Sequence, residues 1–326
     1  MRIPKAALKA DGLLLLTAVI WGSAFSAQRS GMESIGPFAF TAVRFAVGAL
    51  SVLPLLLFMK RRARGAGPSG SPRPKLALKL AYAGITGAVL FFGTSFQQAG
   101  LVTTTAGNAG FITCLYVVLV PIAGFAFGKR SGPRIWAGAV LALAGLYILS
   151  IGAGFSMERG DILELAGALF WTAHILVVGR FGGKMDGLEL AIGQYSVCSI
   201  LSLGGALAFE SAPFAGTLAA AVPILYGGIM STGLAFTLQI FAQKTAHPAH
   251  ASIILSLESL FAAIGGILLL GEPLTARLAI GGALMLTGTI VSQLEPSTPK
   301  VIRISPDPGK PDSIDRGNKE YSRNNP

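Results

Sequence analysis

The segment Asp11-Gly-Leu-Leu-Leu-Leu-Thr-Ala-Val-Ile-Trp21 recurs 150 residues later as Asp161-Ile-Leu-Glu-Leu-Ala-Gly-Ala-Leu-Phe-Trp171. A pattern of spaced glycines that begins at Gly128 recurs 143 residues further on, beginning at Gly271. The offset shortens by seven residues because the first copy has a longer basic loop, near residues 60–75. These matches predict that the chain consists of two copies of one unit.

Each copy contains five apolar segments, and five is an odd number of membrane crossings. The second copy must therefore lie in the membrane in the opposite orientation to the first. Inverted-topology repeats of this kind are typical of secondary transporters. The ten predicted spans are residues 12–29, 37–58, 76–99, 105–127, 134–152, 161–180, 187–209, 217–243, 248–270 and 275–294.

The composition agrees with a membrane protein, since 52% of the residues are hydrophobic, 13% are charged and the mean hydropathy is +0.64. No Asp, Glu, Lys or Arg occurs between Leu80 and Gly128, a run of 49 residues that is long enough for two spans of about 20 residues each. The apolar runs are continuous instead of alternating, so helices are predicted and a β-barrel is not.

The predicted fold class is an all-α integral membrane protein, with ten transmembrane helices arranged as a five-plus-five inverted repeat. The tail is rich in Pro, Lys, Asp and Asn and is expected to be disordered. The expected parts are a cytoplasmic N-terminus (1–11), a first five-helix repeat (12–152), a second, inverted repeat (161–294) and a disordered cytoplasmic tail (295–326).

The basic residues set the expected orientation. If the N-terminus is cytoplasmic, the inner segments and the tail hold 22 of the 26 Lys and Arg residues, and the outer segments hold only Arg29, Arg159 and Arg277. Such a bias predicts cytoplasmic termini in a multi-pass protein of the inner (plasma) membrane. The net charge of +11 is thus attributed to membrane orientation, and we expect the lipid bilayer, not nucleic acid, as a partner.

The sequence lacks the usual signs of an enzyme or of a bound cofactor. Gly124 and Gly128 are separated by three residues where a phosphate-binding P-loop needs four. His247 and His250 are three apart, with no Cys, Asp or third His near them in the sequence, so no metal site is expected. Cys114 and Cys198 fall inside spans as small apolar residues. We therefore expect a protein that is not an enzyme and has no cofactor.

Three stretches resemble a known family. They are Trp21-Gly-Ser-Ala-Phe25, Arg44-Phe45, and the apolar run from Ser256 through Glu258 to Gly271-Glu272. Over residues 11–294 the chain resembles the EamA-type members of the drug/metabolite transporter superfamily. It departs from the family pattern at Ser259, where proline is common, and at Gly128-Lys129, where the family has Gly-Glu.

The resemblance implies a permease that moves small polar metabolites without ATP, by alternating access between two inverted halves. The resemblance favours amino acids or their derivatives as the cargo and export as the direction. Proton antiport and uniport are both left open, as is a homodimer. The alternative from another class is a membrane scaffold or receptor that transports nothing, which predicts a bound partner at the basic loop or tail.

Glu258 and Arg44 are the first candidate site residues, because a charge within a span is costly unless it has a partner or a wet cavity. Glu258 lies ten residues into its span, about 15 Å from the inner end and near the midplane. It could bind a substrate amine or a proton, or accept hydrogen bonds from Ser256 or Ser259. Arg44 could bind a carboxylate, extend toward the bilayer surface, or brace a neighbouring backbone carbonyl.

Further candidates are polar or aromatic. His174 could relay protons or serve only in packing. Gln194 is the repeat equivalent of Arg44 and keeps its hydrogen-bonding capacity without the charge. Asn108 could line a polar path or bridge two helices. Trp21, Trp171 and Tyr195 could form a wall against which a substrate stacks, although packing is the usual role of any single aromatic residue.

Glycine is abundant, with 42 residues, and we expect it to allow close helix contacts. The positions singled out for this role include Gly84, Gly87, Gly138, Gly145, Gly281 and Gly288.

Overall fold

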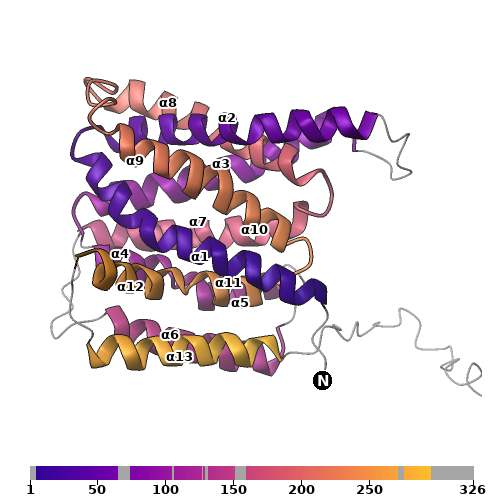
Figure 1. Cartoon of the computed structure of the whole chain (residues 1–326), viewed down its shortest axis with the longest axis vertical. Helices are drawn as coiled ribbons and strands as arrows, with labels where there is room; N and C mark the ends of the chain where they lie inside the picture. The colour runs from indigo at the N-terminus through magenta and orange to yellow at the C-terminus, as the bar shows by residue number, and fades with distance from the viewer. Residues whose placement is uncertain are drawn as a thin grey trace, which may run out of the picture. The chain divides into compact units, whose positions relative to one another are not determined.

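The computed structural model describes residues 5–64, 74–104, 106–126, 128, 131–150, 159–270 and 275–294, and their regular structure is helical throughout (Figure 1). The predicted tail and the centre of the basic loop lie outside these residues. The first-half helices are α1 (Lys5–Met32), α2 (Pro37–Arg64), α3 (Leu76–Leu101), α4 (Ala106–Thr113), α5 (Tyr116–Ala126) and α6 (Pro133–Ser150). The second-half helices are α7 (Arg159–Phe181), α8 (Gly187–Phe209), α9 (Ala221–Leu225), the π-helix η1 (Tyr226–Phe236), α10 (Thr237–Ala242), α11 (Pro248–Leu255), α12 (Glu258–Leu270) and α13 (Ala276–Gln293).

Seven helical segments of the described chain are long and apolar enough to cross a membrane, and shorter apolar helices accompany them. Many large apolar side chains point outward, for example Leu50 (65% exposed), Ile200 (66%) and Ile290 (60%). Outward apolar surface of this extent is expected where lipid replaces water. The chain is therefore an all-α, multi-pass membrane protein.

Two predicted spans are interrupted near their middles. The helix expected over 105–127 breaks between Thr113 and Tyr116, and the helix expected over 248–270 breaks between Leu255 and Glu258. The interruptions lie 142 residues apart, close to the 143-residue offset of the repeat. Irregular backbone at membrane depth is tolerated where protein covers it or where it lines a cavity.

The span predicted over 217–243 also differs from one regular helix. Residues 211–220 form turns, α9 begins at Ala221, and the centre is the 11-residue π-helix η1. Glycines allow η1 to pack closely on α2, because a Cβ built at Gly228 would lie 2.6 Å from the Val47 side chain. π-Helical segments are rare and frequently occur at functional sites.

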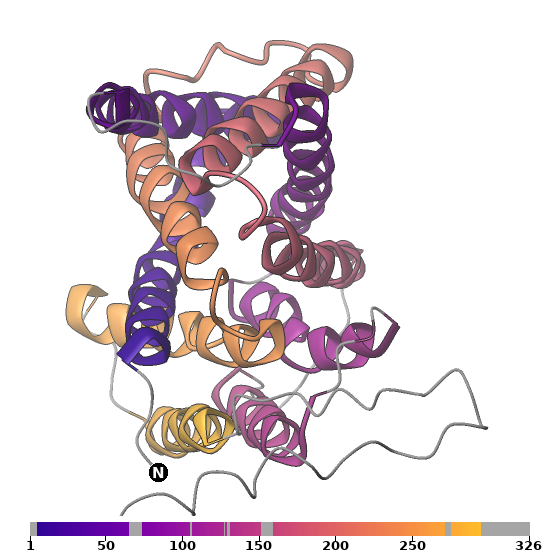
Figure 2. The same ribbon diagram turned by 90° about the vertical axis from the view of Figure 1, so that its right-hand side faces the viewer.

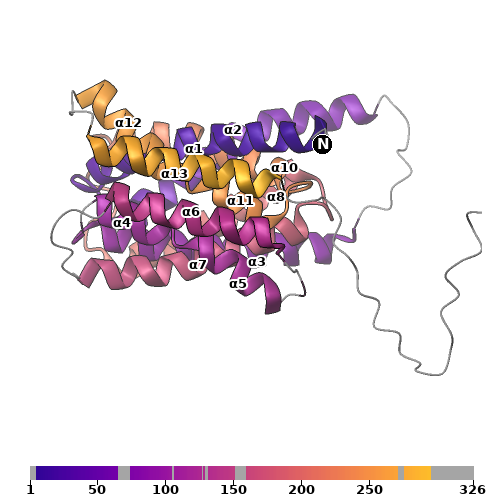
Figure 3. The ribbon, with the colours of Figure 1, turned by 90° about the horizontal axis from the view of Figure 1, so that it is seen from below.

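The described halves interlock instead of lying apart. α1 packs against η1, α10, α11 and α12, and α3 packs against α7 and α8. α6 and α13 form a pair of their own, side by side in Figures 1 and 3 and at the lower edge of Figure 2. The central space is thus bordered by helices from both ends of the sequence.

The α6–α13 pair depends on glycine at matched positions. A Cβ built at Gly145 would lie 2.5 Å from the carbonyl oxygen of Gly281, and one built at Gly138 would lie 2.6 Å from that of Gly288. Such contacts bring two backbones together, as in other small-residue helix interfaces. The expectation is wrong for Gly84, where an added Cβ would meet nothing within 4 Å.

We predict that Gly145→Leu destabilises the protein by about 1–3 kcal/mol, because the new side chain must force α6 away from α13. Gly84→Leu is the matched control and should leave stability unchanged, since its Cβ points into open space. Thermal unfolding of both variants in the same detergent measures the difference. Equal midpoints for the two variants would show that the glycine contacts do not hold this pair together.

Candidate functional site

A central cavity lies between helices of both halves of the chain. The space inside it that the centre of a water-sized sphere can occupy is about 40 Å³, so the cavity is narrow in this conformation. Its aromatic lining residues are Trp21, Phe25, Tyr116, Trp171 and Phe236. Its polar lining residues are Gln28, Arg44, Gln97, Thr113, Ser231, Gln239 and Glu258.

Glu258 is the carboxyl group of this cavity. It is the first residue of α12, directly after the helix break, and is only 4% exposed. Its Oε1 accepts hydrogen bonds from the Tyr116 hydroxyl (2.9 Å) and from the Cys114 thiol (3.3 Å). Tyr116 is the first residue of α5, so this contact joins the two helix breaks across the cavity.

The serines expected to donate to Glu258 have other contacts. The Ser256 hydroxyl donates to the Ile253 carbonyl in α11 (2.8 Å), and Ser259 Oγ lies 3.2 Å from Cys114 Sγ. The donors to Glu258 therefore come from the repeat-related break in the first half. Sequence proximity alone could not identify them.

Arg44 is buried, at 2% exposure, and lines the same cavity as Glu258. Its Nη1 donates to Oε1 of Gln28 (2.7 Å), and its guanidinium carbon lies 5.0 Å from the Phe45 ring centroid. Arg44 thus braces α1 through a side-chain amide and does not extend toward the bilayer surface. Within the described residues its Nε has no hydrogen-bond partner, which leaves donor capacity for an anionic group.

Three predicted residues lie behind the cavity wall. His174 Nε2 lies 3.1 Å from Gln194 Oε1, and the His174 ring meets Trp171 edge-on, with centroids 5.9 Å apart. Tyr195 Oη lies 3.0 Å from the Thr237 hydroxyl. All three of these predicted residues are fully buried and are absent from the residues that line the cavity.

The remaining predictions divide into two groups. Trp21 and Trp171 line the cavity, as expected for an aromatic wall. The Trp21 indole nitrogen donates to the Ser231 carbonyl in η1 (3.2 Å). Asn108 belongs to α4, but its side chain lies outside the described residues, so its role stays a prediction.

Phe236, which the sequence did not single out, organises these aromatic residues. Its ring centroid lies 4.6 Å from that of Trp21, 5.9 Å from that of Trp171 and 5.7 Å from that of His174. Phe236 is the last residue of η1 and had no charge or motif to mark it. The π-helix therefore supplies the centre of the aromatic wall.

Glu164 is a further buried acid that the sequence pattern did not single out. This carboxyl group in α7 is fully buried and accepts a hydrogen bond from the Thr113 hydroxyl (3.1 Å), which in turn accepts one from the Gln97 amide (3.3 Å). Thr113 and Gln97 line the cavity. Glu164 is not part of the lining but is hydrogen-bonded to a residue that is, Thr113. The signal that could have identified Glu164 is its acidic side chain within the predicted span 161–180, where a charge needs a partner.

We predict that Tyr116→Phe destabilises the protein by about 1–3 kcal/mol, because it removes a hydrogen bond from a buried carboxyl group. In a Glu258→Ala background the same change should cost much less, and this difference is the coupling energy of the pair. Denaturation midpoints of the single and double variants measure it. Tyr147→Phe, at a ring that is 55% exposed, is the control. Equal costs in both backgrounds would mean that the two side chains are not coupled.

A multi-pass bundle with a central cavity, aromatic walls and buried polar groups near broken helices belongs to the class of membrane transporters. The comparisons with known proteins identify the family within this class. The sequence model of the EamA-like transporter family matches residues 8–151 and again residues 158–293. The chain belongs to this family.

Relatives agree with this assignment. An uncharacterized transporter of Archaeoglobus fulgidus is 35% identical over 288 residues, which is 88% of this chain and 86% of the relative. The uncharacterized inner membrane transporter YedA of Escherichia coli K12 is 24% identical, over 81% of this chain and 84% of YedA. A probable terminal-alkyne amino-acid exporter of Streptantibioticus cattleyicolor is 26% identical, over 87% of this chain and 93% of the relative.

A solved structure described as "Crystal structure of protein" has the same fold, with a TM-score of 0.69 and 23% sequence identity. The match covers 86% of this chain and 96% of the other. At this identity the likeness establishes the fold alone.

Proposed function

We propose that this protein is a secondary transporter of the inner membrane that exports small polar metabolites, with amino acids or their derivatives as the cargo class. The observation that carries the proposal is the position of Arg44 and Glu258 in the lining of one cavity. A zwitterion carries a carboxylate that suits the fork of a guanidinium and an ammonium group that suits a carboxylate. The aromatic lining offers a surface for the side chain of the cargo.

The repeat supplies the mechanism of the proposal. The ten predicted spans form two five-helix units, residues 12–152 and 161–294, of opposite orientation, and both termini are cytoplasmic. The two separate family matches and the two equivalent helix breaks support this arrangement. Inverted repeats with broken helices at a midplane site are the usual basis of alternating access. The cavity would open to one side of the membrane at a time.

The relatives support the proposal only in its outline. One is described as an inner membrane transporter and another as a probable amino-acid exporter, each at 24–26% identity. The cargo of this chain is inferred from the chemistry of its cavity.

We expect cells that overproduce the protein to accumulate one amino-acid-like compound outside, and Glu258→Gln and Arg44→Gln to lower that export at least about tenfold. Each substitution leaves one charged group of the bound cargo without its partner in the cavity, and removing one partner of a buried charge pair typically costs ~2 kcal/mol or more. Metabolite profiling of the medium, followed by counterflow in liposomes with the compound found, measures the effect. Glu33→Gln, at an exposed acid between α1 and α2, is the matched control.

If no compound changes in the medium and the reconstituted protein shows no flux, the scaffold or receptor alternative is favoured. If export depends on Arg44 but not on Glu258, the zwitterion model is wrong while the transporter assignment stands. These outcomes separate the class of protein from the details of its site.

For the coupling mode we propose proton antiport, with Glu258 as the proton acceptor. This proposal can be tested separately from the cargo. Antiport requires a group that exchanges a proton during the cycle, and glutamine at position 258 cannot do so. We expect Glu258→Gln to abolish concentrative efflux driven by a pH gradient. Unchanged concentrative efflux in this variant would reject Glu258 as the proton acceptor and leave His174 as the candidate. Uniport would be indicated if the parent protein moved its cargo only down the cargo's own gradient.

A further inference from the structure

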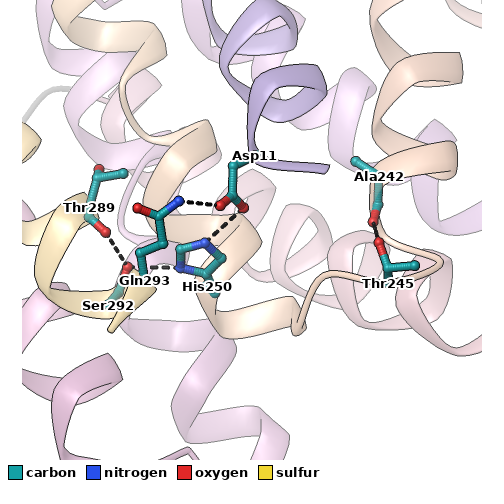
Figure 4. Close-up of polar contacts among 7 residues, drawn as sticks. All are labelled: Asp11, Ala242, Thr245, His250, Thr289, Ser292 and Gln293. Carbon is teal, nitrogen blue, oxygen red and sulfur yellow. Dashed lines mark hydrogen bonds and ion pairs between the residues drawn. The ribbon is translucent and has the colours of Figure 1, made fainter. Parts of the chain in front are cut away.

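A second polar network lies at the end of the bundle where α1 begins, outside the cavity. Asp11 Oδ1 lies 2.9 Å from His250 Nε2 in α11, and Asp11 Oδ2 accepts a hydrogen bond from the Gln293 amide in α13 (2.5 Å). His250 Nδ1 lies 2.8 Å from Ser292 Oγ. Figure 4 shows the carboxylate of Asp11 between His250 and Gln293. Three helices are thus joined by one side chain from each of α1 and α11 and two from α13.

The network is largely withdrawn from solvent, since the side chains of His250 and Asp11 are only 12% and 13% exposed. Ser292 Oγ, which lies 2.8 Å from His250 Nδ1, also donates to the Thr289 carbonyl (2.8 Å). His250 therefore reaches the Asp11 carboxylate through one ring nitrogen and the Ser292 hydroxyl through the other, which ties α11 to both α1 and α13. Sequence proximity did not indicate this partner, because α1 brings Asp11 to His250 from 239 residues away.

The cavity is closed toward this network. Between Asp11 and Trp21, the fully buried residues of α1 are Leu14, Thr17 and Ala18. The Thr17 hydroxyl donates to the Ala235 carbonyl in η1 (3.2 Å) along the same stretch. The residues of α1 that line the cavity begin at Trp21 and continue toward the other end of the helix. Access from the Asp11 end requires α1 to separate from the helices packed on it, which include η1, α10 and α11.

The sequence repeat gives Asp11 a counterpart. Asp161 occupies the equivalent position at the beginning of α7 and accepts a hydrogen bond from Thr104, which lies between α3 and α4. α1 and α7 begin at opposite ends of the bundle (Figure 1). The packing around Asp161 is tight, since a Cβ built at Gly160 would lie 2.6 Å from the carbonyl oxygen of Gly100. Each half therefore begins with an aspartate that ties it to helices of the other part of the bundle.

We propose that Asp11, His250 and Gln293 form a lock that holds one end of the cavity closed, and that Asp161 with Thr104 forms the equivalent lock at the other end. The proposal rests on the transport function proposed above and deepens it, because alternating access requires one end to close when the other opens. These residues touch no substrate in this scheme. They are positioning residues that set the balance between the two states.

The test measures opening of the Asp11 end directly, without a substrate. Ala18→Cys places a thiol on the closed stretch of α1, and the full-length protein in lipid nanodiscs is treated with a charged, membrane-impermeant maleimide. Peptide mass spectrometry follows labelling at position 18 alone, so the buried native cysteines Cys114 and Cys198 can remain. The rate reports how often this stretch is exposed to water.

We expect Asp11→Ala and His250→Gln to raise the labelling rate at position 18 by about tenfold or more, the size expected for the loss of a charge-assisted hydrogen bond. Thr104→Ala, at the opposite lock, should not raise it, and Glu33→Gln should leave it at the level of the protein with the reporter alone. Size-exclusion elution checks that each variant is folded. If Asp11→Ala does not fold, His250→Gln carries the same two outcomes.

Unchanged labelling in a folded His250→Gln variant would overturn the lock, as would an equal increase in Thr104→Ala. Failure of the proposed transport function is distinguishable, because labelling needs no cargo and the export assay needs no reporter. A faster labelling rate without any export activity in the parent protein would retain the lock and reject transport.

Discussion

A backbone within a bilayer must satisfy its own hydrogen bonds, and this constraint governs where the protein can hold a polar site. α4 and α5, and again α11 and α12, are interrupted near the middle of the bundle, where a lipid-exposed break would be costly. Both breaks lie beside the cavity, and Tyr116 and Glu258, the residues that restart the two helices, share a hydrogen bond. The helix breaks and the candidate site are therefore one structural feature.

The rest of the bundle allows this irregular centre to exist. α6 and α13 contact each other through glycine at matched positions, with no charged residue in the middle of either helix, and serve as packing elements. The interior helices carry the polar groups, and η1 supplies an aromatic centre at Phe236. The regular helices at the periphery therefore form the scaffold, and the irregular helices around the cavity form the candidate site.

The two copies of the repeat share a scaffold but carry different chemistry. Trp21 and Trp171 occupy equivalent positions and both line the cavity. Arg44 and its equivalent Gln194 do not share a role, since Arg44 lines the cavity and Gln194 lies behind it, next to His174. A cavity between two such halves is asymmetric, and an asymmetric cavity can distinguish the two ends of a small polar molecule.

The sequence alone determined that the chain is a helical membrane protein of this family. The signals were the apolar composition, the absence of charge from Leu80 to Gly128 and the recurrence of the α1 sequence in α7. These signals can be read without the fold, because hydropathy and repeats are local properties of sequence. Tertiary structure decided which buried polar groups meet. Glu258 contacts Tyr116 across 142 residues, and Asp11 contacts His250 across 239. No sequence neighbour of these residues specified those partners, since helix packing brings them together. The cost of burying a polar group without a partner is what selects such pairs.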